Sequence, residues 1–213
     1  MWQVMHRSGI RRVLPLILVM ALGLLAPVPA SAGGDGSAKA YIDQLARETI
    51  ELSRSGSDGQ AKQLERLLDR STDVAAVGRL VLGSHWRTAS PEQREEYLKL
   101  FRDYVLAGFS RQMGGANGIE KVDVTGSQPA SDQDSMVATR ITLGNGQPPS
   151  QVDWRVRCMS GGYRIVDVVA EGVSLVLTKR NEFGAIVAKS GLDGLLRQLR
   201  EWHDHQGGQA PEA

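Results

Sequence analysis

The spacing of apolar residues changes along this chain, and that change limits the fold more than any other feature. Before the glycine-rich residues 114–118, apolar side chains recur at three- and four-residue steps, as on one face of a helix. After them, apolar and polar residues alternate, as in a strand, until the helical spacing returns near residue 178. An order of helices, then strands, then helices predicts an α+β domain.

The helical segments differ in how clearly they begin. The clearest start is at Ser90, where Gln93 three residues later completes a capping box and Pro91 takes the first helical position. The stripe that follows is rich in aromatic residues, which predicts a long helix with one buried face. The other predicted helices cover residues 38–53, 64–68, 74–81, 178–189 and 192–202.

The alternating part of the chain predicts four strands. They contain residues 122–124, 137–143, 152–158 and 163–170, and Gly161-Gly162 marks a hairpin between the last two. Consecutive strands joined by short turns form an antiparallel sheet. We therefore expect a four-stranded antiparallel curved sheet packed against a helical layer. The pattern alone does not distinguish a filled core from an apolar cavity between the two.

The first 32 residues have the three parts of a secretory signal peptide. A cationic start precedes an apolar run over residues 13–25, and Ala30-Ser31-Ala32 follows. The run is shorter than the roughly twenty residues that a membrane-spanning helix needs. We expect cleavage after Ala32, one domain over residues 33–205 and a polar tail over 206–213. The pair Arg11-Arg12 leaves Sec and twin-arginine export both open.

Charge excludes one class of partner. The signal segment holds three of the 25 basic residues and none of the 24 acidic ones, so the mature chain is slightly acidic. Binding to nucleic acid would need a clustered basic excess, which is absent from the sequence.

Few residues have the spacing of a reactive site. No glycine-rich phosphate loop, serine elbow or zinc-type cysteine pattern occurs. His203 and His205 are two residues apart, a spacing that points them to different sides of a helix, so we expect no metal site and no cofactor. The single cysteine, Cys158, is expected to be a small core residue. Asp167, among apolar neighbours, is the one candidate general base, and a structural carboxylate paired with an arginine is the alternative.

Three segments together carry a family resemblance. They are Leu82-Gly83 followed by Trp86 and the Ser90-Pro91 helix start, the strand pair over residues 152–170, and the stretch DVVAEGVSLVLTKRNEF over residues 167–183. With the signal peptide, this pattern resembles the MlaC family, also called the toluene-tolerance or ABC-transporter auxiliary family. The resemblance covers nearly the whole mature chain.

The resemblance implies a function without catalysis. Such a protein is a monomeric periplasmic carrier that holds the acyl chains of a phospholipid in an apolar cavity. It shuttles lipid between an outer-membrane lipoprotein–porin complex and an inner-membrane ABC transporter with an MCE-domain subunit, which maintains the lipid asymmetry of the outer membrane. The lipid class, the number of chains and the direction of transport stay open. The alternatives are a hopanoid or sterol-like cargo, an enzyme that uses Asp167 as base, and a protein-binding module.

Mapping this cavity onto the chain gives a set of candidate lipid-contacting residues. They are the inward positions of the predicted strands and the apolar positions of the helices. Each is equally compatible with an ordinary core role. From the helices they are Leu80, Val81, Phe101, Tyr104 and Val105, and from the strands and the segment after them Val122, Val124, Val152, Trp154, Val156, Ile165 and Leu175. Arg180 is a candidate for a phosphate contact or for an ion pair with Asp167 or Glu171.

Overall fold

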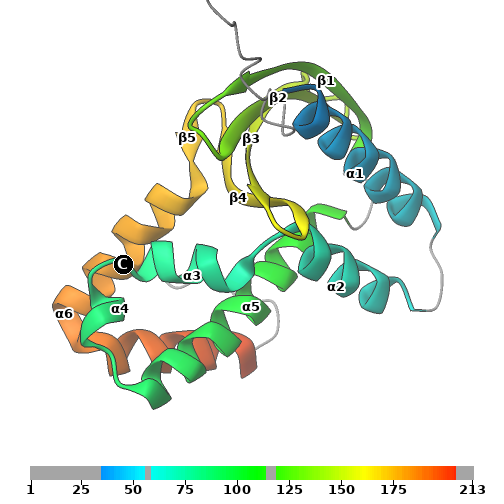
Figure 1. Cartoon of the computed structure of the whole chain (residues 1–213). Helices are drawn as coiled ribbons and strands as arrows, with labels where there is room; N and C mark the ends of the chain where they lie inside the picture. Colours follow the sequence, from blue (N-terminus) through cyan, green and yellow to red (C-terminus); the bar gives the residue numbers. More distant parts are fainter. Residues whose placement is uncertain (1–34, 56–58, 114–118, 205–213) are drawn as a thin grey trace, which may run out of the picture. The chain divides into compact units, whose positions relative to one another are not determined.

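An open, curved antiparallel sheet forms one part of the domain, and its strands follow chain order, β1-β2-β3-β4-β5 (Figure 1). The computed structural model describes residues 35–55, 59–113 and 119–204, which all belong to the unit Ser31–Ala213. The strands are β1 (Ile119–Pro129), β2 (Asp134–Leu143), β3 (Ser150–Met159), β4 (Gly162–Ala170) and β5 (Val173–Ser174). The α+β class and the antiparallel curved sheet are confirmed, with a short fifth strand that the sequence did not predict.

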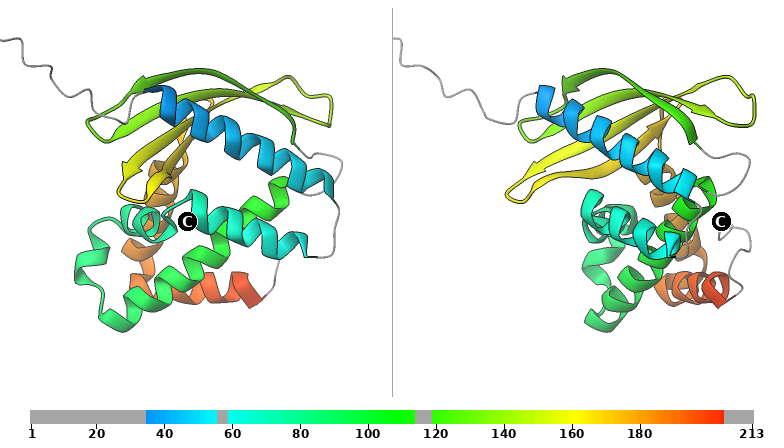
Figure 2. Two further views of the ribbon diagram at one scale, coloured as in Figure 1. Left: turned by 45° about the vertical axis from the view of Figure 1, so that its right-hand side comes forward. Right: turned by 90° about the vertical axis from the view of Figure 1, so that its right-hand side faces the viewer.

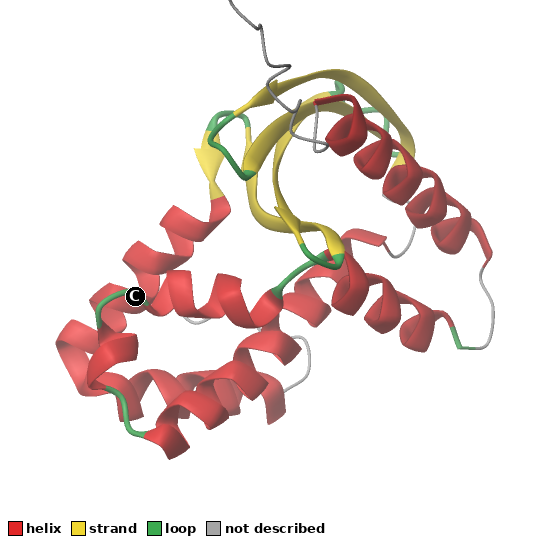
Figure 3. Ribbon diagram, in the orientation of Figure 1, coloured by secondary structure: helices red, strands yellow, loops and turns green. Residues whose placement is uncertain are grey.

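The helices precede and follow the sheet in the chain, as the spacing predicts (Figure 3). A kink at Gly191, whose φ is 72°, divides the last helix at the point where two separate helices were expected. That helix also begins at Leu175, three residues earlier than expected. The helices are α1 (Asp35–Ser55), α2 (Gln60–Ser71), α3 (Val74–Leu82), α4 (His85–Thr88), α5 (Pro91–Met113) and α6 (Leu175–Asp204).

Helix α1 packs on one face of the sheet, as all three views show (Figures 1 and 2). Residues two apart on a strand point to the same face, and on this face α1 lies against β1, β2 and β3. The apolar group between α1 and the sheet includes Ala38 and Ile42 of α1, which are fully buried. We call this group the sheet cluster: Ala38, Tyr41, Ile42, Leu45, Val124, Val137, Trp154, Val156, Tyr163, Ile165 and Val168.

A bulge in β4 explains why that strand has apolar residues on both faces. Arg155 pairs with Asp167 whereas Val156 pairs with Ile165, so Val166 is an extra residue with no partner in the register. The bulge shifts the alternation by one. Ile165 and Val168, three positions apart, therefore both belong to the sheet cluster.

A second group of apolar side chains is made by helices alone. Helices α3, α5 and α6 pack against one another around Phe183, which is fully buried. Gly78 of α3 allows a close approach, because a Cβ there would lie 3.0 Å from the ring of Phe101. We call this group the helical cluster, with buried members Leu68, Val74, Val81, Leu82, Tyr97, Leu100, Phe101, Phe183, Ile186, Leu195, Leu196 and Leu199.

The link between α2 and α3 lies against the free edge of β4. Thr72 forms a parallel bridge with Ile165, and the hydroxyl of Tyr41 donates to the carbonyl oxygen of Ser71 at 3.1 Å. These bonds join α1, α2 and the sheet next to the β3–β4 hairpin.

Some expectations were wrong or lie outside the described residues. Cys158 is exposed instead of forming part of the core, because it lies at the end of β3, one residue before the hairpin. The predicted signal peptide, the polar tail and His205 lie outside the described residues, and the domain boundaries stay predictions.

The outer face of the sheet holds a buried carboxylate, Asp134, that is paired with two half-exposed arginines, and this arrangement gives a pH prediction. Asp134 is only 2% exposed, and Arg157 Nε donates to its Oδ1 at 2.7 Å while Arg155 Nε donates to its Oδ2 at 2.8 Å. The hydrogen bonds from Arg157 lower the pKa of Asp134. The resulting stabilisation is present above the unfolded aspartate pKa, roughly 3.9, and is lost as pH falls through the folded value.

We predict that Asp134→Asn lowers the free energy of unfolding by about 1–3 kcal/mol at pH 7 and has a smaller effect below pH ~3. Urea denaturation across this pH range measures both values. Asp132→Asn, on an exposed residue of the preceding turn, is the control and should change neither. An equal loss at every pH would contradict a role for the charge.

Candidate functional site

The twelve sequence-predicted lipid residues fall into three groups. Val124, Trp154, Val156 and Ile165 meet in the sheet cluster. Val81 and Phe101 lie in the helical cluster, with Tyr104 and Val105 packed against it. Val122 and Val152 are half-buried on β1 and β3, and Leu80 and Leu175 are exposed at 44% and 46%. The structure thus brings four of the strand positions together and places four of the five helical positions in or against a different cluster.

The helical cluster is filled by its own aromatic side chains. The rings of Tyr97 and Phe101 stack with centroids 5.6 Å apart, and Phe183 meets both edge-on at 6.5 and 6.4 Å. The ring centroids of Tyr104 and Trp202 are 5.0 Å apart. The Tyr97 hydroxyl donates to the carbonyl of Gly78 at 3.0 Å, so the buried polar atom of that ring is satisfied. Ring separations in this range are typical of a packed core.

The sheet cluster differs because it contains a buried polar atom without a partner. Trp154 Nε1 donates to Thr139 Oγ1 at 3.0 Å, and that hydroxyl donates to the Val152 carbonyl at 2.6 Å. The Tyr163 hydroxyl, by contrast, is buried and has no hydrogen-bond partner among the described residues. Its ring lies 5.7 Å from that of Tyr41. Burial without a partner is unfavourable for a hydroxyl, so this atom marks a place where a bound molecule would gain a bond.

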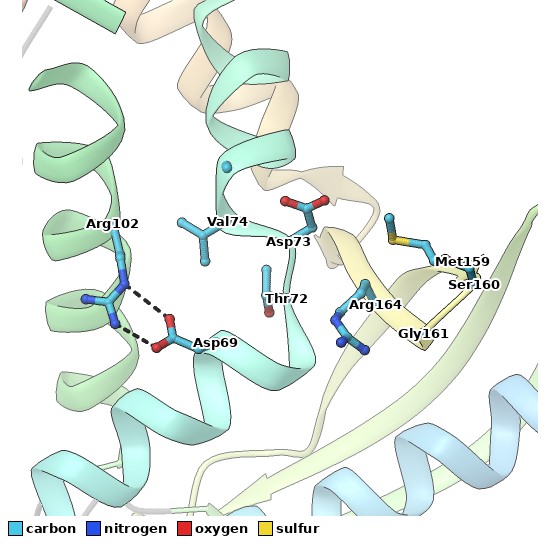
Figure 4. Close-up of a pocket in the computed structure, with 10 residues that line it drawn as sticks. Asp69, Thr72, Asp73, Val74, Arg102, Met159, Ser160, Gly161 and Arg164 are labelled. Carbon is cyan, nitrogen blue, oxygen red and sulfur yellow. Dashed lines mark hydrogen bonds and ion pairs between the residues drawn. The ribbon is translucent and has the colours of Figure 1, made fainter. Parts of the chain in front are cut away.

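Two pockets open beside the sheet cluster, next to the β3–β4 hairpin. The first, the hairpin pocket, measures about 410 Å³ and lies between the α2–α3 link and the hairpin, with Asp69, Asp73, Arg102 and Arg164 in its wall (Figure 4). The second, the α1–α2 pocket, measures about 190 Å³. It is lined by residues of α1 and of the end of α2, and by Arg164 again. Both have charged walls, so neither is the apolar cavity that the sequence led us to expect.

Asp167, on β4, is a structural carboxylate that binds the start of α6. Its Oδ2 accepts from the Ser174 hydroxyl at 2.6 Å, and its Oδ1 accepts from the backbone N–H groups of Val176 at 3.1 Å and Val168 at 2.8 Å. Ser174 Oγ in turn accepts from the N–H of Leu177 at 3.1 Å. Two N–H groups that a helix start leaves unpaired are thereby satisfied. The partner of Asp167 is a helix start, and the arginine proposed from the sequence is not among its hydrogen-bond partners in the described residues.

The rest of the motif segment is also structural. Glu171 and Gly172 form a two-residue turn between β4 and β5, with φ values of 48° and 81°, the left-handed pair of a tight hairpin. Lys179 forms an ion pair with Glu182, with Nζ 2.5 Å from Oε2. Arg180 forms no ion pair with Asp167 or Glu171, and its guanidinium lies against Gly83, at the end of α3. Two motifs that are almost one hundred residues apart in the sequence therefore touch.

Neither a metal site nor a membrane helix is found in the described ranges. No group of three or more potential metal ligands occurs there. No helix in the same part of the chain is long and apolar enough to span a membrane. His203, on α6, lies 3.5 Å from Asp103.

The contact between Gly83 and Arg180 leads to a prediction. Gly83 has φ 61° and ψ −128°, and a Cβ there would lie 2.9 Å from Arg180 Nε. We expect Gly83→Ala to lower the free energy of unfolding by about 1–3 kcal/mol, since both backbone strain and the displaced guanidinium oppose it. Thermal or urea denaturation measures this. The control Gly184→Ala, in α6 with open space around it, should be neutral or stabilising. Similar stability for both variants would contradict the contact.

The role of Asp167 can be tested in the same way. We expect Asp167→Ala to lower the free energy of unfolding by about 1–3 kcal/mol, because Ser174 and the helix start lose their acceptor. Ser174→Ala should cost a similar amount. The double variant should lose less free energy of unfolding than the sum of the two single losses, because both substitutions remove the bond between Ser174 and Asp167. Full additivity in urea denaturation would show that the two side chains act separately.

Comparisons with known proteins agree with this fold. The model of the family described as MlaC protein matches residues 39–201. The intermembrane phospholipid transport system binding protein MlaC of Haemophilus influenzae is 25% identical over 128 residues, which are 59% of this chain and 59% of that protein. The aligned part thus spans less than two thirds of that relative.

A solved structure extends the comparison to the whole fold. It is a phospholipid-binding protein from Ralstonia solanacearum in complex with a phospholipid, and it is similar with a TM-score of 0.65 at 20% identity. The similarity covers 82% of this chain and 98% of that one, which shows a shared fold. Because the family model matches far more than half of the sequence, the chain belongs to the MlaC family.

Proposed function

We propose that the protein is a periplasmic carrier that binds the acyl chains of a phospholipid and transfers the lipid between membrane complexes. The observation that carries this proposal is the sheet cluster, an apolar layer between α1 and the sheet in a chain of the MlaC family. The names of its relatives, an intermembrane phospholipid transport protein and a phospholipid-binding protein, support the same cargo.

The energetics of lipid binding explain why such a protein needs no reactive group. Burial of one CH₂ contributes about 0.8 kcal/mol, so two chains of about sixteen carbons contribute on the order of 25 kcal/mol of gross transfer free energy. Single hydrogen bonds contribute far less. The same magnitude makes release into water very slow, so the cargo must pass directly to an apolar surface of a partner.

The sheet cluster is the better candidate for the acyl chains. The aromatic rings of the helical cluster already fill their own interior, as the contacts around Phe183 indicate. In the sheet cluster a single helix, α1, covers the strands, and the Tyr163 hydroxyl lacks a partner among the described residues. Chains that separate α1 from the sheet would lie along Val124, Trp154, Val156 and Ile165.

Exposed apolar residues near the start of α6 suit a transfer surface. Leu80 of α3 and Leu175 of α6, both predicted lipid residues, are half-exposed, and Val173 and Leu177 are 56% and 58% exposed. Large apolar side chains on a monomer surface favour contact with a partner or a lipid. We propose an inner-membrane ABC transporter with an MCE-domain subunit and an outer-membrane lipoprotein–porin complex as these partners.

The enzyme alternative is less well supported. Both oxygens of Asp167 accept hydrogen bonds at the start of α6, and a general base must be available to its substrate. A hopanoid or sterol-like cargo in the same cluster is a second alternative, and identification of the extracted lipid separates it from phospholipid. A protein-binding module is the third, and it predicts no bound lipid.

We predict that the exported protein purifies with a phospholipid bound, as native mass spectrometry and lipid extraction would detect. Trp154→Glu should remove most of the lipid, because a carboxylate in the sheet cluster is costly to bury beside acyl chains. Binding to a partner complex should persist, since the exposed surface is unchanged. A wild-type protein that stays empty after incubation with phospholipid vesicles would contradict the function itself.

Met136→Glu is the matched control for this variant. Met136 precedes the fully buried Val137 on β2 and therefore points to the opposite face of the sheet. It should retain its lipid, and circular dichroism should confirm that both variants are folded. Equal lipid in both variants would place the acyl chains outside the sheet cluster.

A further inference from the structure

Arg164 is the charged residue that the two pockets share. It lies on β4, three residues after the turn of the β3–β4 hairpin, and lines both the hairpin pocket and the α1–α2 pocket. Within the described part of the chain it forms no ion pair, and its guanidinium donates one hydrogen bond, from Nη1 to the carbonyl oxygen of Tyr163 at 2.8 Å. Its remaining donors are available to a ligand.

The other arginines of these pockets are already neutralised. Arg102 donates to Asp69 at 3.1 and 2.8 Å and to Glu65 at 2.9 Å. In Figure 4 two dashed bonds join Arg102 to Asp69, whereas no dashed line reaches Arg164. Arg70, in the α1–α2 pocket, is paired with Glu48.

The carboxylates that face Arg164 are likewise engaged elsewhere. Asp69 binds Arg102, and Glu48 binds Arg70. Asp73 accepts a hydrogen bond from the N–H of Ala76 at 2.9 Å, at the start of α3. The positive charge of Arg164 is therefore the one left without a direct counterion among the described residues of both pockets.

The α1–α2 pocket also reaches the apolar layer. Tyr41 and Leu45 line this pocket and belong to the sheet cluster. The ring of Tyr41 packs on that of Tyr163, whose buried hydroxyl has no partner in the described ranges. The pocket that contains Arg164 therefore borders the apolar layer, and within the described residues that layer contains the unpartnered hydroxyl of Tyr163.

We propose that Arg164 binds the phosphate of the lipid headgroup while the Tyr163 hydroxyl donates to an ester carbonyl of the cargo. This inference rests on the proposed function and adds to it a headgroup site at the β3–β4 hairpin. A guanidinium matches two phosphate oxygens with parallel N–H bonds. The ester groups of a phospholipid lie between its phosphate and its chains, and Tyr163 is both the neighbour of Arg164 on β4 and a member of the sheet cluster.

The test compares two soluble short-chain lipids on the delipidated protein. Dioctanoyl phosphatidylglycerol has the phosphate and dioctanoylglycerol lacks it, and both are used as monomers in titration calorimetry. Arg164→Gln should lower the affinity for dioctanoyl phosphatidylglycerol about tenfold, since a charge-assisted bond to the phosphate is lost. The affinity for dioctanoylglycerol should not change. Tyr163→Phe should lower the affinity for each of the two lipids about threefold, because both lipids have ester carbonyls.

Arg140→Gln is the matched control. Arg140 is exposed on β2 and lines neither pocket, so its replacement should change neither affinity. An equal loss of phosphatidylglycerol binding in this variant would reduce the effect of Arg164 to general surface charge and overturn the site. Unaltered binding in Arg164→Gln would overturn it as well. Unaltered binding in Tyr163→Phe would remove the ester contact.

A further arm separates the headgroup from free phosphate. Inorganic phosphate at millimolar concentration should neither bind measurably nor displace dioctanoyl phosphatidylglycerol. Arg164-dependent binding of inorganic phosphate with an affinity equal to that of the lipid would assign the site to the free ion and overturn the lipid assignment. If the wild-type protein binds neither lipid, the proposed function fails, whereas binding of both with no effect of Arg164 refutes the headgroup site alone.

Discussion

The hydrogen bonds of Asp167 connect the sheet to the helices that follow it. The carboxylate is on β4 and its acceptor atoms bind Ser174 and the first turn of α6. That turn leads, within two further turns, to Phe183 at the centre of the helical cluster. One side chain of the sheet therefore holds the first turn of α6. Gly83, which lies against Arg180 of the same helix, fixes α3 beside it. The bonds of Asp167 thus join the sheet to α6, and the contact of Gly83 with Arg180 joins α6 to α3 within the helical part of the domain.

Much of the fold follows from local sequence patterns. The capping box at Ser90 and Gln93 forms as expected, with the N–H of Ser90 donating to Gln93 Oε1 at 3.0 Å and the N–H of Gln93 donating to Ser90 Oγ at 3.2 Å. The alternation of residues 137–143 and 152–158 gives the two central strands. These patterns are local because each depends on residues within one turn or one strand, where spacing alone decides which side chains meet.

Other features depend on contacts that spacing does not encode. The bulge at Val166 places Ile165 and Val168 on one face, although simple alternation would separate them. Which helix covers the sheet is also a long-range choice, and α1 covers it while Phe101 and Tyr104 pack among the helices. For this reason the sequence predicted the strand residues of the candidate site, whereas it did not predict which helix packs on them. Arg164 could not be singled out from the sequence. It matters because the charged residues around it are bound to other partners, and those contacts are known only from the structure.

The distribution of polar side chains is consistent with the proposed role as a lipid carrier. In the family motif, Asp167, Ser174 and Glu171 hold backbone groups or turns, so their chemistry is used for the scaffold. Burial of acyl chains supplies the affinity, and it discriminates poorly between lipids that share the same chains. Selection among headgroups therefore requires a polar contact outside the apolar layer. A site at its border can provide such a contact without placing an unpaired charge inside, since a guanidinium at a pocket surface remains partly hydrated when the carrier is empty.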